Sequence, residues 1–176
     1  MASFSLQEPV ERFLDRIASA EPAPARGSVA AVAVAMAARL AHEWPQASEV
    51  VDRAEALRSR MATLALADED AYAKVIEALR LPTDSPSRDA EVETALSGAA
   101  DVPLAVAEAA AEVAVLAALV AQEGNERLRG DALVAAELAE AGARGAAELV
   151  AINLAGRDDP RVGRAKDVAA ATHRDR

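Results

Sequence analysis

Apolar residues recur along nearly the whole chain with the spacing of an amphipathic α-helix, and the alternation typical of a half-buried strand is almost missing. Proline, glycine and polar clusters interrupt this pattern at intervals. The pattern predicts helical segments at residues 6–20, 28–42, 45–79, 86–124 and 131–154, then a weak last helix and a frayed tail from about residue 160. Two of these segments, 28–42 and 86–124, are apolar nearly all round, as in helices at the middle of a bundle or in a subunit interface.

Short connections between such segments favour antiparallel neighbours. The sequence therefore predicts an all-α fold, an antiparallel bundle of five to six helices in a single domain over residues 1–176. Within the fourth segment, Pro103 in "AADVPLAV" predicts a kink or a break. Gly124 and Asn125 are predicted to end that segment, and Asp131 to cap the next one.

Composition changes this picture mainly through alanine. Just over half of the residues are hydrophobic (52%), but roughly a quarter of the chain is alanine, far above average usage. The aromatic residues are Phe4, Phe13, Trp44 and Tyr72. Alanine favours helices but buries little apolar area, so an alanine core fills only where helices lie close together. We therefore expect the bundle to gain stability from oligomerisation.

Charge and residue usage argue against several classes of function. A net charge of −10 provides no basic surface for nucleic acid. The chain has no cysteine, and His42 and His173 are far apart, which argues against a thiolate or two-histidine metal site. The N-terminal segment carries acidic residues, unlike a secretory signal, and the apolar stretch 105–121 contains Glu108 and Glu112. A soluble cytoplasmic protein without a membrane segment is expected.

The loop "PAPARGS", residues 22–28, is the first candidate for a ligand site. Its prolines fix the backbone, Gly27 lets the backbone approach a ligand, and the following helix offers unpaired N–H groups. Arg26 adds a positive charge, so the loop would suit an anionic or carbonyl-bearing ligand. The alternative is a plain turn in which Ser28 caps the helix.

The segment "LALADEDAYAKV", residues 64–75, places one of three neighbouring acids on the apolar side of its helix. Asp68 lies one turn after Leu64 on the inward stripe, and Tyr72 follows one turn later on the same side. Burial favours the neutral form of a carboxyl group, which can then donate or accept a proton near pH 7. The alternative is that the helix end is solvated, or that Asp68 bonds to a neighbouring backbone group.

Two further stretches combine polar residues with helix ends. In "GNERLRGD", residues 124–131, Arg127 and Arg129 bring positive charge into an acidic chain, and Asp131 begins the next helix. In "VAINLAG", Asn153 lies among apolar neighbours. For Asp131 the alternative is an N-cap alone, and for Asn153 a hydrogen bond to the backbone.

Five stretches follow one another at compatible spacing over about residues 6–159: "IASAEPAPARGS", "DEDAYAKVIEALRLP", "ADVPL", "GNERLRGD" and "VAINLAG". In this order they resemble the formiminotetrahydrofolate cyclodeaminase and methenyltetrahydrofolate cyclohydrolase family. That family typically shows P-x-P-G-G-G-S, then D-x-x-A-F/Y with L-P after it, then G-N-x-N-x-x-S-D and I-N-L. Each motif alone is weak, and five in order are a much stronger signal.

The resemblance implies an all-helical homodimer that binds folate in a cleft near these loops, with tetrahydrofolate as part of the substrate and no metal or other cofactor. One family reaction closes 5-formiminotetrahydrofolate to 5,10-methenyltetrahydrofolate and releases ammonia; the other hydrolyses methenyltetrahydrofolate. By motif match, the implied catalytic acids are Asp68 and Asp131. The substrate-binding residues implied by the match are Pro24, Gly27, Ser28, Tyr72, Asn125 and Asn153. Arg26 and Arg127 stand where the chain differs from the family motifs, and they are added as substrate-binding candidates because their positive charge suits an anionic ligand.

The chain departs from the family pattern in its loops. The triple glycine is replaced by Ala25-Arg26-Gly27, the serine of the late loop by Gly130, and the lysine-rich segment after the second helix by "HEWPQASEV". These changes leave a second hypothesis open, a diverged helical dimer that binds another small ligand or a protein partner. The folate hypothesis expects the segments that carry Gly27, Asp68 and Asp131 to converge on one pocket.

Overall fold

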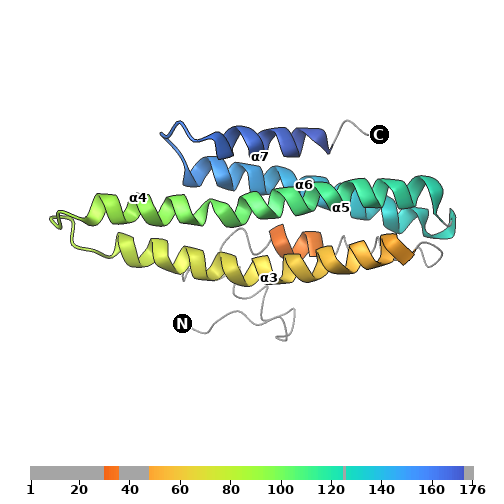
Figure 1. Ribbon diagram of the computed structural model, residues 1–176, viewed down its shortest axis with the longest axis horizontal. Coiled ribbons are helices and arrows are strands. Elements are labelled where there is room, and N and C mark those ends of the chain that lie inside the picture. Colours follow the sequence, from red (N-terminus) through yellow and green to blue (C-terminus); the bar gives the residue numbers. More distant parts are fainter. Residues whose placement is uncertain (1–29, 36–47, 125, 173–176) are drawn as a thin grey trace.

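The structure, a computed structural model, describes residues 30–35, 48–124 and 126–172, and every regular element in these ranges is a helix (Figure 1). The elements are a helical piece at 30–35, α3 (Ser48–Leu79), α4 (Arg88–Ala99), α5 (Asp101–Glu123), the 3-10 turn η1 (Glu126–Leu128), α6 (Arg129–Asn153) and α7 (Pro160–Ala171). The predicted all-α class is confirmed, and α3 ends at the predicted residue. The predicted helix at 6–20 and most of the one at 28–42 lie outside the described residues.

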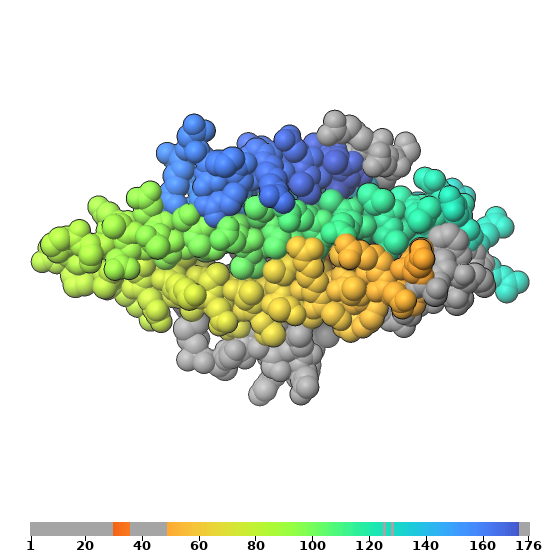
Figure 2. Space-filling model, in the orientation of Figure 1, coloured from red at the N-terminus to blue at the C-terminus, as the bar shows by residue number. Residues whose placement is uncertain are grey.

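The helices pack side by side as an antiparallel bundle. α3 runs against the direction of α4 and α5, and α5 runs against α6 (Figure 1). α5 packs most extensively against α6, and α7 lies against both. On the face shown in Figure 2, α4 and α5 lie between α3 and α7. The most apolar segment of the chain is thus the central helix of the described bundle, as its sequence predicts.

The interface between α5 and α6 is built mostly from alanine. The buried alanines of these two helices are Ala107, Ala109, Ala110, Ala114, Ala117, Ala132, Ala135, Ala136, Ala139, Ala143, Ala146 and Ala147. Gly142 extends the same principle to the helical piece at 30–35, because a Cβ at this position would collide with the side chain of Val34. Small residues therefore let the helices approach closely, and few large side chains fill the remaining core.

The helix break predicted around Pro103 is present, three residues earlier, at Ala100 between α4 and α5. Proline has no N–H to donate to the carbonyl four residues before it, which here is the carbonyl of Ala99. The side-chain amide of Asn153 donates to this oxygen instead, with an Nδ2–O distance of 2.9 Å. The end of α6 is therefore hydrogen-bonded to the carbonyl that Pro103 leaves without a helical partner.

The segment Arg88–Glu123 is long and apolar enough to cross a membrane by composition, with a mean hydropathy of 2.1 in the window tested. Half of that window is buried inside the protein. The packing of α5 against α3, α6 and α7 accounts for the apolar sequence as that of a core helix.

Two local predictions need correction, whereas the predicted end of α5 is confirmed. Asp131 does not cap α6, because the helix begins two residues earlier at Arg129 and places Asp131 in its first turn. Gly124 follows the last residue of α5 as its C-cap, as predicted, in an extended conformation with φ of −80°. Glycine is needed there because a Cβ would collide with the carbonyl oxygen of Val120. The segment after residue 160, expected to fray, is helical to Ala171.

Arg161 explains why this last helix is ordered. Its guanidinium donates to Asp101 at 2.6 Å, to the carbonyl and hydroxyl oxygens of Ser97 at 2.9 and 2.8 Å, and to both oxygens of Asp159. Asp159 also caps α7 by accepting from the backbone N–H of Arg161 at 2.9 Å. The hydrogen bonds from Arg161 lower the pKa of Asp159 to about 2, from an ordinary value of 3.8. One side chain thus ties the start of α7 to the α4–α5 junction.

Replacing Arg161 by methionine is expected to destabilise the protein by about 1–3 kcal/mol, because several charge-assisted hydrogen bonds are lost together. Because the pKa of Asp159 is lower in the folded protein than its ordinary value, the ionised carboxylate stabilises the folded state at pH values above about 4. This contribution is lost as the pH falls from about 4 to 2. The variant should therefore lose part of the wild-type pH dependence in that window. Thermal unfolding at pH 7 and pH 3 measures both effects. Arg58→Met, which removes an exposed pair with Glu55 and a 3.5 Å contact with the hydroxyl of Ser59, is the control and should change stability little.

Candidate functional site

Asp68 is buried in the middle of the bundle, with 7% of its surface exposed. It lies on the side of α3 that also buries Met61, Ala65 and Val75. The helical spacing that placed this acid inward is therefore confirmed. Asp68 takes part in at least one interaction with the rest of the chain.

Tyr72 lies at the border of the face of α3 that carries Asp68, and Val75 further along this face is buried again. Tyr72, the next residue on this side, is 38% exposed, and Leu79, two turns further, is 46% exposed. Asp68 thus lies one turn from an accessible aromatic side chain at the border of the packed face of α3. A ligand seated against Tyr72 would be adjacent to the buried carboxyl group.

Asn153 and Asp68 lie at nearly the same position along the bundle axis. Its bond to Ala99 places Asn153 beside the end of α4, and Ala99 lines the same cavity as Ala71, which lies one turn after Asp68 on α3. The bond satisfies one side of the amide and supports the structural reading of this residue. A role for Asn153 in substrate binding stays a prediction.

The described part of the segment 124–131 lies far from Asp68 along the bundle axis. Arg53 and Arg60 near the start of α3 both pair with Glu112 of α5, and α5 continues from there to the end of the bundle where α3 begins. Arg127 and Asp131 follow at this end, and both are exposed. Asp68 lies about 20 residues into α3, or roughly 30 Å along the axis at 1.5 Å per residue. The described part of one chain therefore does not bring Asp68 and Asp131 to one pocket.

The predicted residues of the first loop, Pro24, Arg26, Gly27 and Ser28, lie outside the described residues, as does Asn125. Their roles stay predictions. Among the described residues no group of three or more histidines, cysteines, aspartates or glutamates could hold a metal ion.

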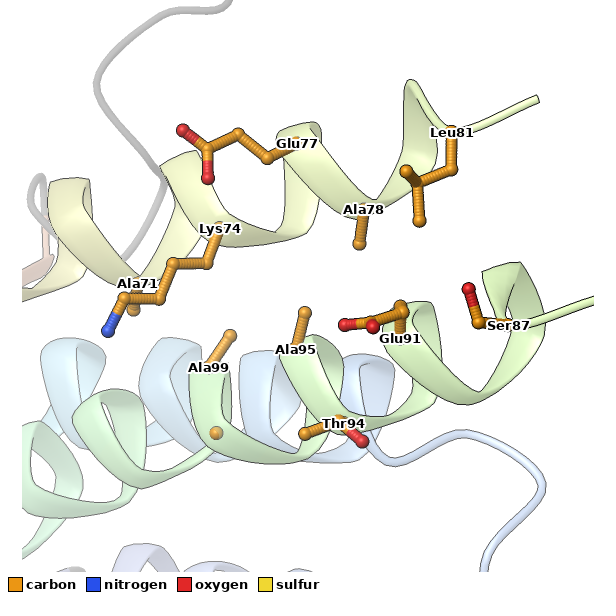
Figure 3. Close-up of a pocket in the computed structure, with 11 residues that line it drawn as sticks. Ala71, Lys74, Glu77, Ala78, Leu81, Ser87, Glu91, Thr94, Ala95 and Ala99 are labelled. Carbon is orange, nitrogen blue, oxygen red and sulfur yellow. The ribbon is translucent and has the colours of Figure 1, made fainter. Parts of the chain in front are cut away.

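A groove that the sequence reading missed lies between the second half of α3 and α4 (Figure 3). It has a volume of about 570 Å³ and contains none of the predicted site residues. Alanines on both helices, among them Ala71, Ala78 and Ala95, form much of its surface, and their small size leaves the gap open. Its charged groups are Lys74, Glu77 and Glu91, and Figure 3 shows Glu91 within the gap and Glu77 directed away from α4. Two carboxylates against one ammonium do not suit an anionic ligand.

The sequence profile of the formiminotransferase-cyclodeaminase family matches residues 9–171. The chain belongs to this family. The match covers nearly the whole chain, including the predicted first loop, α3 and the late loop. The resemblance inferred from five short motifs is confirmed.

Individual relatives agree with this assignment. The chain is 35% identical over 170 residues to a methenyltetrahydrofolate cyclohydrolase of Methylorubrum extorquens, covering 86% of this chain and 82% of the relative. It is 32% identical to the formimidoyltransferase-cyclodeaminase of Sus scrofa but spans only 31% of that protein. The crystal structure of formiminotetrahydrofolate cyclodeaminase from Thermotoga maritima superposes with a TM-score of 0.81 at 25% identity, covering 95% of this chain and 92% of the other.

Proposed function

We propose that the chain is a folate-dependent enzyme of one-carbon metabolism, which either cyclises 5-formiminotetrahydrofolate to 5,10-methenyltetrahydrofolate or hydrolyses methenyltetrahydrofolate. The observation that carries the proposal is the buried Asp68 beside the exposed Tyr72, in a chain whose relatives bear both names. Family membership supports the substrate class, and the burial of Asp68 supports its role as the group that transfers a proton.

In the cyclisation, N10 of the folate attacks the formimino carbon on N5 and loses its proton, while the imine nitrogen gains a proton and is left as an amino group on the same carbon. The attack is intramolecular, so the protein mainly has to hold the two nitrogens in the geometry of ring closure. The C–N bond to the amino group then breaks, and a general acid must protonate the departing nitrogen so that it leaves as ammonia. We assign this proton transfer to Asp68. No bond to the protein forms and no electron transfer is needed.

In the hydrolysis, water adds to the methenyl carbon and the bridge opens at one of its two C–N bonds. The proton lost by the water must be accepted, and the nitrogen set free must gain one, so the same carboxyl group can serve. Both reactions act on the carbon between N5 and N10. A single site can therefore support either, and the fold alone does not choose between them.

Two assays of the purified chain test the proposal, both based on the near-ultraviolet absorbance of methenyltetrahydrofolate. Cyclodeaminase activity makes this absorbance appear from the formimino substrate together with free ammonia, and cyclohydrolase activity makes it decay faster than without protein. Absence of both signals at high protein concentration would reject the proposal. The loop changes at Arg26 and Gly130 would then favour the diverged family member that binds another ligand or a protein partner.

The proposal includes a cytoplasmic homodimer. The alanine-rich core buries little apolar area per residue, while several aliphatic side chains, including Val115, Leu133, Val134 and Ile152, are about half exposed. Association of two chains would cover part of this surface and add to the stability of the fold.

A further inference from the structure

The helix α4, which forms one wall of the groove between α3 and α4, is held in place largely by hydrogen bonds from another part of the bundle. Side chains of α6, of α7 and of the turn between them donate to three backbone carbonyl oxygens of α4. These bonds run from Asn153 to Ala99 at 2.9 Å, from Arg157 to Glu93 at 3.0 Å and from Arg161 to Ser97 at 2.9 Å. Within α4 only Ala99 is buried. The position of α4, and with it the width of the groove, therefore depends on these polar contacts.

The walls of the groove are made mostly of small residues. Ala71 and Ala78 line it from α3, and Ala95, Gly98 and Ala99 line it from α4. A Cβ at Gly98 would meet no atom within 4 Å, so packing inside the chain does not require a glycine there, although glycine is less favourable in a helix than alanine. The groove volume of about 570 Å³ falls within the range of roughly 300–1,000 Å³ that small-molecule pockets show. The groove can therefore hold a small molecule.

Lys74 on α3 and Glu91 on α4 give the groove one positive and one negative group at different points along its length. Figure 3 shows the ammonium group of Lys74 near Ala71 and the carboxylate of Glu91 beside Ala95. Neither group forms an ion pair with any residue in the described ranges. Glu77 is directed away from α4 and adds no charge inside the gap (Figure 3). The two opposite charges are therefore available to a ligand.

A ligand that matches this pattern has an amino group at one end, a carboxylate at the other and an apolar chain between them. Its two charged ends would meet groups of opposite sign, and its chain would cover the alanine walls and remove apolar surface from water. A ligand with a single charge would pair with one of the two residues and leave the other without a partner.

We propose that the groove between α3 and α4 binds an elongated apolar zwitterion, whose amino group pairs with Glu91 and whose carboxylate pairs with Lys74. This class of ligand includes ω-amino fatty acids and short apolar peptides with free ends. The groove contains neither Asp68 nor Tyr72, so the proposal does not depend on the proposed folate reaction.

Isothermal titration calorimetry with three octyl compounds tests which charges the groove recognises. ω-Aminooctanoate carries both charges, octanoate lacks the amino group, and octylamine lacks the carboxylate. We expect a dissociation constant of about 1 mM or lower for ω-aminooctanoate. Because Lys74 and Glu91 are exposed, each missing charge should weaken binding by roughly 2–5-fold. Equal affinities for the three compounds would overturn the proposal, because the charges would then play no part in recognition.

The tripeptide trileucine, titrated in the same way, distinguishes the two sources of such a ligand. Tighter binding of trileucine than of ω-aminooctanoate identifies a peptide as the ligand, and the reverse order identifies an amino fatty acid. Either order supports the proposed class of ligand.

The variant Glu91→Gln removes the negative group of the groove and keeps its shape. It should weaken the binding of ω-aminooctanoate by the same roughly 2–5-fold as the loss of the amino group from the ligand. Asp89→Asn is the matched control, because Asp89 belongs to the same helix but is fully exposed and lies outside the groove. It should bind as the wild type does. An unchanged affinity of Glu91→Gln would contradict the assigned pair.

The variant Gly98→Leu tests the place of binding, because its side chain would fill the gap between the helices. It should lose binding and keep the wild-type helical dichroism. Gly163→Leu is the control, since Gly163 is also an exposed helical glycine with no atom within 4 Å of a Cβ, but on α7. It should bind normally. Wild-type affinity of Gly98→Leu, or no binding of either zwitterion to the wild type at about 10 mM, would overturn the proposal.

Discussion

Replacing Asp68 by asparagine is expected to lower kcat by roughly 10²–10⁴-fold, the range that one general acid or base contributes. Asparagine has nearly the same shape and can keep a hydrogen bond, but it has no carboxyl proton to transfer. Since the substitution preserves the packing around a buried position, the helical dichroism and the binding of folate should change little. The loss should therefore appear in kcat more than in KM.

The neighbouring Asp70 provides a matched control, because it lies on the same helix but is exposed. Asp70→Asn should retain wild-type turnover. If Asp68→Asn also turned over at the wild-type rate while the wild type was active, Asp68 would be a structural residue and the proton would have to come from elsewhere.

Replacing Leu57 by alanine is expected to destabilise the protein by about 2–5 kcal/mol, the usual cost of truncating a fully buried leucine. Leu57 is 1% exposed, and it is one of few large side chains in a core otherwise built from alanine. Neighbouring alanines cannot extend into the space that the substitution leaves, so the cavity should persist. For a chain of this size the melting temperature should fall by roughly 5–15 °C.

Leu66 on the same helix is the control for this effect, since it is 37% exposed. Leu66→Ala makes the same chemical change without opening a buried cavity and should shift the melting temperature by far less. Equal losses for the two variants would show that burial in α3 does not govern the stability of the chain. Thermal unfolding followed by circular dichroism at a fixed protein concentration measures both.

The sequence best predicted the features that depend on residues close together in the chain. The end of α3, the break before Pro103 and the burial of Asp68 follow from helix periodicity, proline geometry and the cost of placing a carboxyl group among apolar residues. Each depends on residues a few positions apart, so each can be read along the chain.

Features that depend on packing between distant segments could not be predicted from the local sequence pattern. The ordered α7 depends on Arg161 reaching Ser97 and Asp101 across the bundle, whereas its own sequence indicates only a weak helix. The height of Asp131 relative to Asp68 depends on how α5 and α6 align with α3. Motif order along the chain carries no information about that alignment, which is why one pocket was expected where one chain provides two separate regions.

The bond between Asn153 and the carbonyl of Ala99 has a consequence for how this sequence can change in evolution. If Pro103 mutated to a residue with an N–H, the carbonyl of Ala99 would regain its helical donor, and the hydrogen bond from Asn153 would no longer be needed. If Asn153 mutated first, the carbonyl of Ala99 would lose its side-chain donor, and Pro103 has no N–H to replace it. Pro103 and Asn153 are therefore expected to occur together in related sequences. Where the proline is replaced, the asparagine should vary as well.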